Sequence, residues 1–463
     1  MTSAIQSTEA SFDWPLAYQA ESLVRDFISA FLAHNAPAQS LAARMLKETG
    51  TDFLEWVDHL TLSPEHRTEL SDAGFVQEPV AAPPADEAFH HPRAMLPRVV
   101  LRSAGSERGI PAKLAIRPES VVDFAARHQL PAKIQGSFGH RLREVTISDE
   151  NGHLFSAIER LACRDFVEPS SPGGFAEAVI AVRELWRIRK RDFADNEDSV
   201  RQAFALQREA IERVGADVAC DLFFAEERTY WELRNRAGRI QKRRQDLLGL
   251  GWGNHDHHTF RSSRRFFADL VAFLLNFGFQ KRERYYAGAE AGWGAQILEH
   301  AVTGITVFAD VDLMPDETAI DFSQQRLPEA PVLRTVGLWC ELHGDSFLQA
   351  GMHHLEARFE FEQLRDQLTD EGINIMNPFS NFDFLKQAFT QGEHWPVNPH
   401  RVQGLLARGL ITQEQATQFL KEGAVGSHLE NLQRRGGFKG FNQKSVSVII
   451  AATDPRGIQA AGH

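Results

Sequence analysis

The segment His255–Arg261 reads HDHHTFR and combines three histidines with an arginine over seven residues. Its length and composition are typical of a short β-strand that follows a glycine-rich entry loop. Because side chains two residues apart on a strand point to the same face, His257 and Arg261 should share one face. His255 has the same phase, whereas His258 should point to the opposite face.

This clustering of histidines indicates a metal site. Neutral imidazole is a common ligand of zinc, iron and copper. An arginine in phase with His257 could hold an anionic group of a substrate in a bidentate contact beside the metal. The alternative is that these histidines are ordinary polar residues near a turn, and the segment by itself leaves both interpretations open.

Further ligands must come from other parts of the chain. His353 and His354 begin the strand-like run GMHHLEARFEF. A carboxylate could complete a triad of two histidines and one acid, which leaves coordination positions open for substrate and dioxygen at Fe(II). Glu430, in GSHLENLQRRGGFKGFN, is a candidate, but the chain has 62 acidic residues and the pattern alone does not single it out.

Hydrophobic periodicity predicts strand–helix–strand units around these segments. A helix with phenylalanine and leucine on one side should follow HDHHTFR and end near Gly278. Strands should follow at Gln280–Tyr286 and Gly304–Leu313, with a turn at Gly288–Gly294. A second unit should begin at Gly351–Phe361 and continue into a helix, and residues 425–450 should hold a last strand and a short helix. The predicted fold class is therefore α+β.

The chain of 463 residues is too long for one hydrophobic core, so we expect two or three domains. Residues 1–76 should be helical, including a run from Phe53 to Leu60, and the proline-rich residues 77–98 should form a linker. Residues 99–170 should form a small α+β module, with strands at Ala112–Arg117, Leu142–Ile147 and His153–Ile158. Residues 171–248 should be a helical connector, and residues 249–463 the metal-binding domain.

Composition excludes several classes of function. The net charge is −12 and the pI about 5.9, so no overall electrostatic footprint for nucleic acid is present. The basic run Arg234–Arg244 could contact an anionic partner such as RNA, but a solvated helix face is the simpler interpretation. The chain lacks HExxH, GxSxG and Walker A motifs.

The cysteines and the apolar stretches bear on the cellular compartment. Cys163, Cys220 and Cys340 are far apart and odd in number, which supports neither a disulfide framework nor a CxxC metal site. The longest apolar stretch, Leu270–Phe277, is far shorter than the roughly 20 residues that cross a bilayer. We therefore expect a soluble, cytoplasmic protein with no membrane contact.

Residues 249–463 resemble the 2-oxoadipate dioxygenase/decarboxylase family of the vicinal oxygen chelate superfamily. Asp256–Arg261, DHHTFR, is similar to the family's Asp-His-x-x-x-Arg segment, and His353–Arg358, HHLEAR, to its Asn-His-x-x-x-Arg segment. His353 stands where the family has asparagine. Leu429–Asn442, LENLQRRGGFKGFN, resembles the closing Glu-x-x-x-Arg/Lys-Gly-Gly-Phe segment, and Phe277–Leu313 the strand-rich stretch after the first helix.

The resemblance implies paired βαβββ modules around an Fe(II) ion. It implies His257, His354 and Glu430 as the metal ligands, Arg261 as the residue that binds a substrate carboxylate, and Arg358 as a second substrate-binding residue. The implied reaction converts 2-oxoadipate and dioxygen to 2-hydroxyglutarate and CO2. The alternatives are another metal-dependent enzyme of the superfamily, such as an aromatic 2-oxo acid dioxygenase, a lyase or an isomerase, or a non-catalytic binding protein. Nothing in the sequence indicates an oligomeric state.

Overall fold

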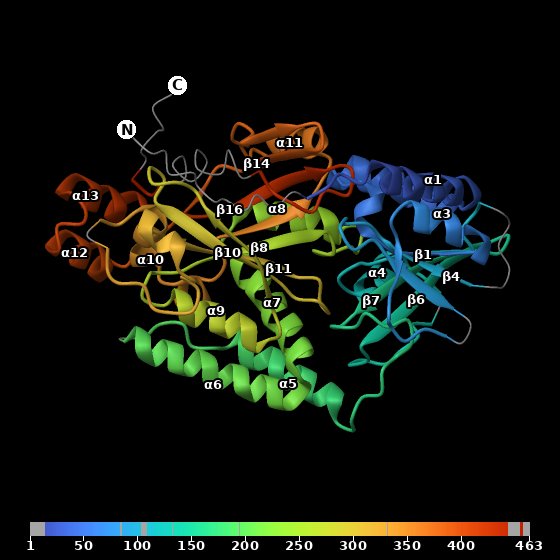
Figure 1. The fold of residues 1–463 in the computed structure, drawn as a ribbon, viewed down its shortest axis with the longest axis horizontal. Coiled ribbons are helices and arrows are strands. Elements are labelled where there is room, and N and C mark those ends of the chain that lie inside the picture. Colours follow the sequence, from blue (N-terminus) through green and yellow to red (C-terminus); the bar gives the residue numbers. More distant parts are fainter. Residues whose placement is uncertain are drawn as a thin grey trace, which may run out of the picture.

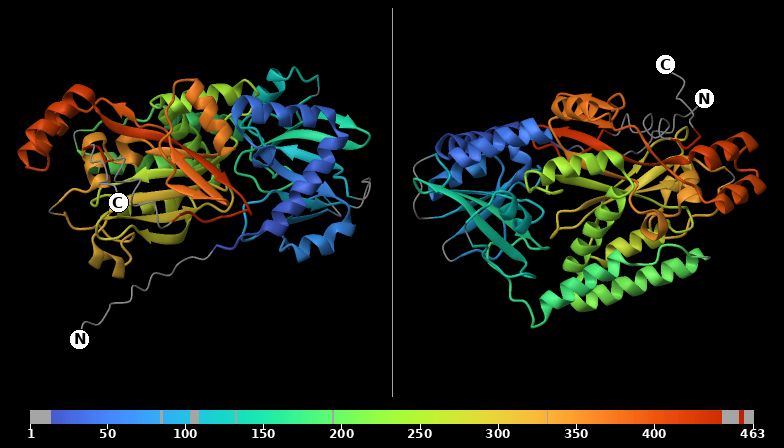
Figure 2. Two further views of the ribbon diagram at one scale, coloured as in Figure 1. Left: turned by 90° about the horizontal axis from the view of Figure 1, so that it is seen from above. Right: turned by 180° about the vertical axis from the view of Figure 1, so that it is seen from behind.

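The protein is built on two mixed β-sheets, one in each half of the chain, with helices packed around both (Figure 1). The computed structural model describes residues 14–83, 86–102, 109–131, 133–193, 195–330, 332–442 and 454–456. The two sheets lie next to each other along the longest axis, and the same arrangement is visible from above and from behind (Figure 2). The predicted α+β class is confirmed.

The first module of the C-terminal sheet begins with the strand that contains HDHHTFR. Its elements are β8 (His255–Arg261), α9 (Phe267–Asn276), β9 (Gln280–Tyr286), β10 (Trp293–Glu299) and β11 (Thr306–Asp312). β8 pairs in parallel with β11, and β11, β10 and β9 follow as an antiparallel series. The sequence pattern did not predict β10, because the glycines before it indicate only a turn.

The second module repeats this order of elements. It consists of β12 (His354–Arg358), α11 (Phe361–Asp370), β13 (Ser380–Phe382), β14 (Leu385–Phe389) and β16 (Ala424–Arg434). β15 (Glu393–Trp395), α12 (Pro399–Ala407) and α13 (Gln413–Glu422) are inserted before β16. β12 pairs in parallel with β16 and antiparallel with β8, which joins the modules into one sheet. The strand order confirms the predicted paired βαβββ modules.

The N-terminal sheet has the same strand order. Its first module contains β1 (Val57–Leu62), α3 (Arg67–Asp72), β2 (Val76–Gln77), β3 (Glu87–His90) and β4 (Arg98–Leu101). Its second module contains β5 (Lys113–Ile116), α4 (Val121–Arg127), β6 (Leu142–Glu150) and β7 (His153–Arg160). β1 pairs in parallel with β4, β5 pairs in parallel with β7, and β1 joins β5 antiparallel. Within the described residues, the second module is one strand shorter than its C-terminal counterpart.

The strands predicted in residues 112–158 are present as β5, β6 and β7, but residues 53–98 differ from the sequence prediction. The predicted helix over Phe53–Leu60 is wrong, because a short 3-10 turn at Phe53–Trp56 leads directly into β1. Residues 77–98, expected as a linker, contain β3 and join the same sheet as residues 113–160. Short apolar runs fit both helix and strand periodicity, and strands of two to four residues leave little pattern to detect.

Helices cover the sheets on their outer faces. α1 (Tyr18–His34) and α2 (Ala36–Arg44) pack on the N-terminal sheet. α5 (Phe175–Arg187), α6 (Asn196–Val214), α7 (Ala216–Glu232) and α9 cover one face of the C-terminal sheet (Figure 1). α10 (Thr335–His343) precedes β12. No helix within the described residues is long and apolar enough to cross a membrane.

The basic run Arg234–Arg244 lies mostly in α8 (Arg236–Asp246). Arg236 donates hydrogen bonds to the backbone carbonyls of Glu371 and Gly372, and Arg244 donates to that of Glu48. Several of these arginines therefore bind protein groups rather than forming only a solvated face.

Candidate metal centre

Three neighbouring strands bring the predicted ligands together. His257 lies on β8, His354 on β12 and Glu430 on β16, and all three are buried. One ligand atom from each residue lies within 4.8 Å of the others. Oε2 of Glu430 is 3.2 Å from Nε2 of His354 and 3.8 Å from Nε2 of His257. The donor set of two imidazoles and one carboxylate suits a divalent transition metal with open coordination positions.

A second carboxylate orients the first histidine. Glu356 contacts Nδ1 of His257, on the opposite side of the ring from Glu430. A proton on Nδ1 toward this carboxylate leaves the lone pair of Nε2 available, as is common for metal-bound histidines. Gln387 donates hydrogen bonds to Oε1 of Glu356 at 3.0 Å and to Oε1 of Glu430 at 3.1 Å, which holds both acids in place.

The buried carboxylates of this cluster favour the binding of a cation. Burial, reinforced by the neighbouring Glu356, raises the pKa of Glu430 well above its usual range. Burial lowers the pKa of His257, but Glu356 and the acids around it outweigh burial and raise that pKa to about 10. Burial and the nearby His257 hold the pKa of His354 well below its usual range. A divalent cation would neutralise the buried acids in place of these protons, so the residues present fit a metal.

The second histidine also has neighbours that restrain it. Nε2 of His354 lies 2.9 Å from the hydroxyl of Thr259, and Nδ1 lies 2.9 Å from Nδ1 of His353. His353 therefore takes part in orienting His354. The ring of His354 also packs against Phe389, with ring centroids 5.0 Å apart.

A small cavity of about 60 Å³ opens beside these side chains. Arg261 forms part of its wall together with Asp310, and aromatic side chains form most of the rest: Tyr285, Trp293, Phe308, Phe379, Phe389 and Phe441. Arg261 is 1% exposed, and its Nε and Nη1 have no hydrogen-bond partner within the described residues. Burial raises the pKa of Asp310 to about 7, so this acid only partly balances the guanidinium. A buried donor group facing a cavity is suited to binding an anionic ligand.

Two other predicted residues do not join this cavity. Arg358 is absent from its described lining and pairs instead with Glu55, at 3.0 Å between Nη1 and Oε2. His255 packs against His258 rather than sharing the face of His257. The pairing of β8 with β12 shifts register next to Asp256, and this irregularity reverses the phase expected for His255.

Glu356 and Gln387 were not predicted from the sequence. Glu356 lies two residues after His354 in HLEAR, so strand phase could have placed it on the same face. Gln387 lies on β14 and had no such signal, since only the pairing of β14 with β16 brings it to the site.

The N-terminal sheet lacks the corresponding set of ligands. Matching the pairing of β1 with β5 to that of β8 with β12 aligns His59 with His257 and Lys113 with His354. The parallel pairing of β7 with β5 then aligns Ser156 with Glu430. Among the described residues, the groups of potential ligands lie in the C-terminal sheet alone.

The fold and the site together define a protein of paired βαβββ modules with a candidate mononuclear metal centre. No protein-family model matches the chain, and no curated protein matches it.

Solved structures do match, at low similarity. A mutant of 4-hydroxymandelate synthase from Streptomyces coelicolor is 14% identical with a TM-score of 0.28, and the match covers 87% of this chain and 98% of that chain. A fusion of a xylose isomerase-like TIM barrel with 4-hydroxyphenylpyruvate dioxygenase is 11% identical with a TM-score of 0.22, over 88% of this chain and 53% of that chain. The Mn(II)-bound glyoxalase from Novosphingobium aromaticivorans is 11% identical with a TM-score of 0.19, over 82% of each chain.

Proposed function

We propose that this protein is an Fe(II)-dependent dioxygenase that acts on a 2-oxo acid. The observation that carries the proposal is the convergence of His257, His354 and Glu430 beside Arg261 in an aromatic-lined cavity. Two histidines and one carboxylate are the ligand set of many non-haem Fe(II) oxygenases. A bound ferrous ion would supply the redox chemistry with dioxygen.

The protein's own residues would bind and orient the substrate. Arg261 would hold a carboxylate of the 2-oxo acid, since its partly unpaired guanidinium faces the cavity. The aromatic wall, including Phe308 and Phe389, would keep water away from the reacting groups. Glu356 would keep His257 in the tautomer that presents Nε2.

We propose 2-oxoadipate as the substrate on the basis of the sequence resemblance. The balanced reaction consumes 2-oxoadipate and dioxygen and yields 2-hydroxyglutarate and CO2. An aromatic 2-oxo acid is the nearest alternative, because the cavity wall is rich in aromatic side chains.

The test combines metal analysis with oxygen uptake. The protein is purified without oxygen in the presence of ferrous iron, its metals are quantified, and oxygen uptake is measured with a panel of linear and aromatic 2-oxo acids. We expect one iron per chain and uptake that depends on a 2-oxo acid. His257→Ala, His354→Ala and Glu430→Ala should each lose most of the iron, whereas the exposed His400→Ala should keep it.

Three outcomes would contradict the proposal. Full iron occupancy in all three variants would remove the ligand assignment. Bound zinc or nickel without oxygen uptake would point to a lyase or an isomerase. No bound metal of any kind would favour a non-catalytic binding protein.

A further inference from the structure

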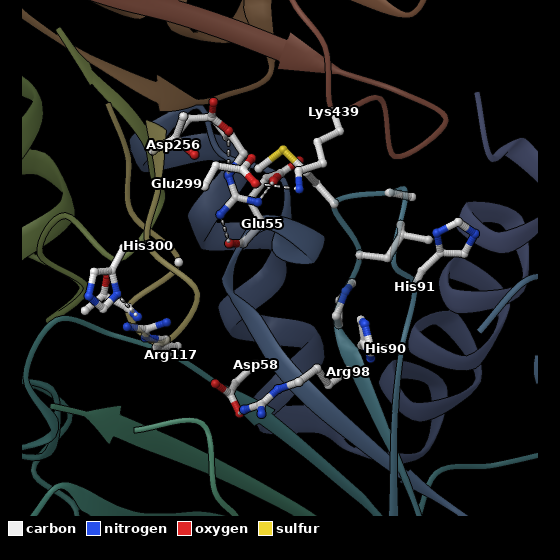
Figure 3. A pocket seen from close by; sticks show the side chains of 18 of the residues that line it. Glu55, Asp58, His90, His91, Arg98, Arg117, Asp256, Glu299, His300 and Lys439 are labelled. Carbon is white, nitrogen blue, oxygen red and sulfur yellow. Dashed lines mark hydrogen bonds and ion pairs between the residues drawn. The ribbon is translucent and has the colours of Figure 1, made fainter. Parts of the chain in front are cut away.

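A second, larger cavity of about 610 Å³ lies between the two sheets, and Figure 3 shows it from close by. β1, β4 and β7 contribute to one side of it, and β8, β11 and β16 to the other. We call this larger space the interdomain cavity, and the smaller one beside His257, His354 and Glu430 the metal cavity. Phe308 and Phe441 line both, so they form part of the wall between them.

The wall of the interdomain cavity carries an excess of positive charge. Eight arginine and lysine side chains line it, against four aspartate and glutamate side chains, within the described residues. Six of the eight cations have a carboxylate oxygen within 3.0 Å. The two without such a partner are Arg98 and Arg117. In the view of Figure 3 they lie on either side of Asp58.

Residues at matching positions of the two sheets form several of these ion pairs. β1 reads VDHLTL, and the matching part of β8 reads HDHHTF, so Asp58 corresponds to Asp256. Residues 113–117, KLAIR, match residues 354–358, HLEAR, so Arg117 corresponds to Arg358.

The last strands complete the correspondence, because Arg160 on β7 matches Arg434 on β16. Arg160 pairs with Asp58 at 2.7 Å, and Arg434 pairs with Asp256 at 2.9 Å. Related pairs of residues from the two sheets thus face the same cavity.

The two sheets differ at Arg117, which lacks the acidic partner that its counterpart Arg358 has. Its counterpart Arg358 is neutralised by Glu55, which lies two residues before β1. The position two residues before β8 is Gly253, which has no side chain to play the same part for Arg117. A Cβ at Gly253 would collide with the carbonyl oxygen of Arg117, so the backbone here leaves no room for an acidic residue. Within the described residues, the guanidinium of Arg117 has neither a hydrogen bond nor an ion pair.

Arg98 is the second cation without a close carboxylate, although its Nη1 donates a hydrogen bond to the backbone carbonyl of Arg164 at 2.5 Å. Its guanidinium lies 3.7 Å from Asp58 and 3.7 Å from Glu78. Both acids already have closer arginine partners, namely Arg160 and Arg164. Burial lowers the pKa of Arg98 to about 10 and also lowers the pKa of Arg117, which reflects the cost of keeping two charges away from water.

We infer that the interdomain cavity binds a small dianion, either a dicarboxylate or a phosphate group, through Arg117 and Arg98. Two guanidinium groups without a close carboxylate match two negative charges, and a guanidinium can form bidentate hydrogen bonds to a carboxylate or a phosphate. The cavity volume exceeds that of either group, so the anion can belong to a larger molecule. This site is distinct from the metal centre and does not depend on the proposed reaction.

The test is calorimetric titration of the full-length protein with inorganic phosphate and, separately, with succinate. We expect at least one of these probes to bind at one site per chain, and the stronger probe identifies the chemical class. Arg117→Gln and Arg98→Gln should each weaken binding by about tenfold or more, since each removes a charged hydrogen-bonding partner. Arg239→Gln, at an exposed position on α8, should leave binding unchanged.

Two further variants separate the possible explanations. His257→Ala should bind the probe as the wild type does, whereas loss of binding there would place the anion at the metal centre and overturn the inference. Arg117→Lys keeps the charge but loses the planar fork, so its binding should lie between those of the wild type and Arg117→Gln.

Stability measurements check that the variants remain folded. Arg117→Gln should melt no lower than the wild type, since it removes a charge without a partner. Phosphate or succinate should raise the melting temperature of the wild type by more than that of Arg117→Gln. Failure of both probes to bind, or unchanged binding in both Arg117→Gln and Arg98→Gln, would overturn the inference.

Discussion

The carboxylate of Glu356 lies against Nδ1 of His257, while Nε2 of the same ring faces Glu430. Glu356 and Glu430 occupy paired positions on the parallel strands β12 and β16, and Gln387 bridges them. The two acids therefore have different tasks in the proposed metal centre. Glu430 is placed to bind the metal, and Glu356 to orient the histidine that binds it.

Glu356→Gln should weaken metal binding without removing a ligand. The amide keeps the shape of the side chain but loses the charge that orients His257, and such changes typically reduce metal affinity by about 10- to 100-fold. Competition with a chelator of known affinity measures the effect. Glu362→Gln, at an exposed position on α11, is the matched control. Equal metal affinity of Glu356→Gln and the wild type would contradict this role.

Arg261→Ala should keep the metal but bind the 2-oxo acid poorly. Loss of a charge-assisted pair to the substrate carboxylate should raise KM by about 10- to 100-fold. Arg261→Lys, which keeps the charge, should fall between this variant and the wild type. Iron content and oxygen-uptake kinetics measure the two properties separately. Unchanged KM and kcat in Arg261→Ala would rule out substrate binding by this residue.

His59 should make the protein less stable in acid. Burial lowers the pKa of His59 to about 4 despite its contact with Asp58, against about 6.5 in an unfolded chain. Below pH 6.5 the unfolded chain therefore takes up a proton that the folded chain does not. The free energy of unfolding falls as the pH drops from about 6.5 to about 4, and this one residue contributes about 2 kcal/mol of the loss by pH 5.

Urea unfolding at pH 7.5 and at pH 5 measures this effect. The difference in stability between the two pH values should be about 2 kcal/mol smaller in His59→Gln than in the wild type. His400→Gln, at an exposed position, should behave like the wild type. A pH dependence that His59→Gln shares with the wild type would show that His59 does not cause it.

Phe223→Ala should destabilise the helical layer beneath the C-terminal sheet. Phe223 is fully buried and its ring packs against five others: Trp186, Phe224, Phe260, Phe273 and Phe277. Truncation of such a side chain leaves a cavity and costs about 3–5 kcal/mol. Denaturation with guanidinium chloride, followed by circular dichroism, should show the loss. Ile188→Ala, at a position that is 68% exposed, should change stability by less than about 0.5 kcal/mol.

Local patterns were enough to predict much of the C-terminal half. Strand phase in HDHHTFR placed His257 and Arg261 on one face, and both line the metal cavity. The same reasoning failed for His255, because the register irregularity in β8 depends on the partner strand β12. In the N-terminal half, strands such as Glu87–His90 are too short to have a clear period, so the strands of residues 57–101 were not predicted. The longer strands β6 and β7 of the same sheet were predicted.

The sequence by itself determined the types of the elements in the C-terminal modules and the chemistry of their side chains, because periodicity and residue type are local properties. The tertiary structure decided which side chains meet. Pairing of β8, β12 and β16 brought His257, His354 and Glu430 together, and pairing of β14 with β16 added Gln387. Packing of the two sheets placed Glu55 beside Arg358 and left Arg117 facing the interdomain cavity opposite a glycine. Such contacts depend on strand register and sheet packing between distant segments, which no local pattern contains.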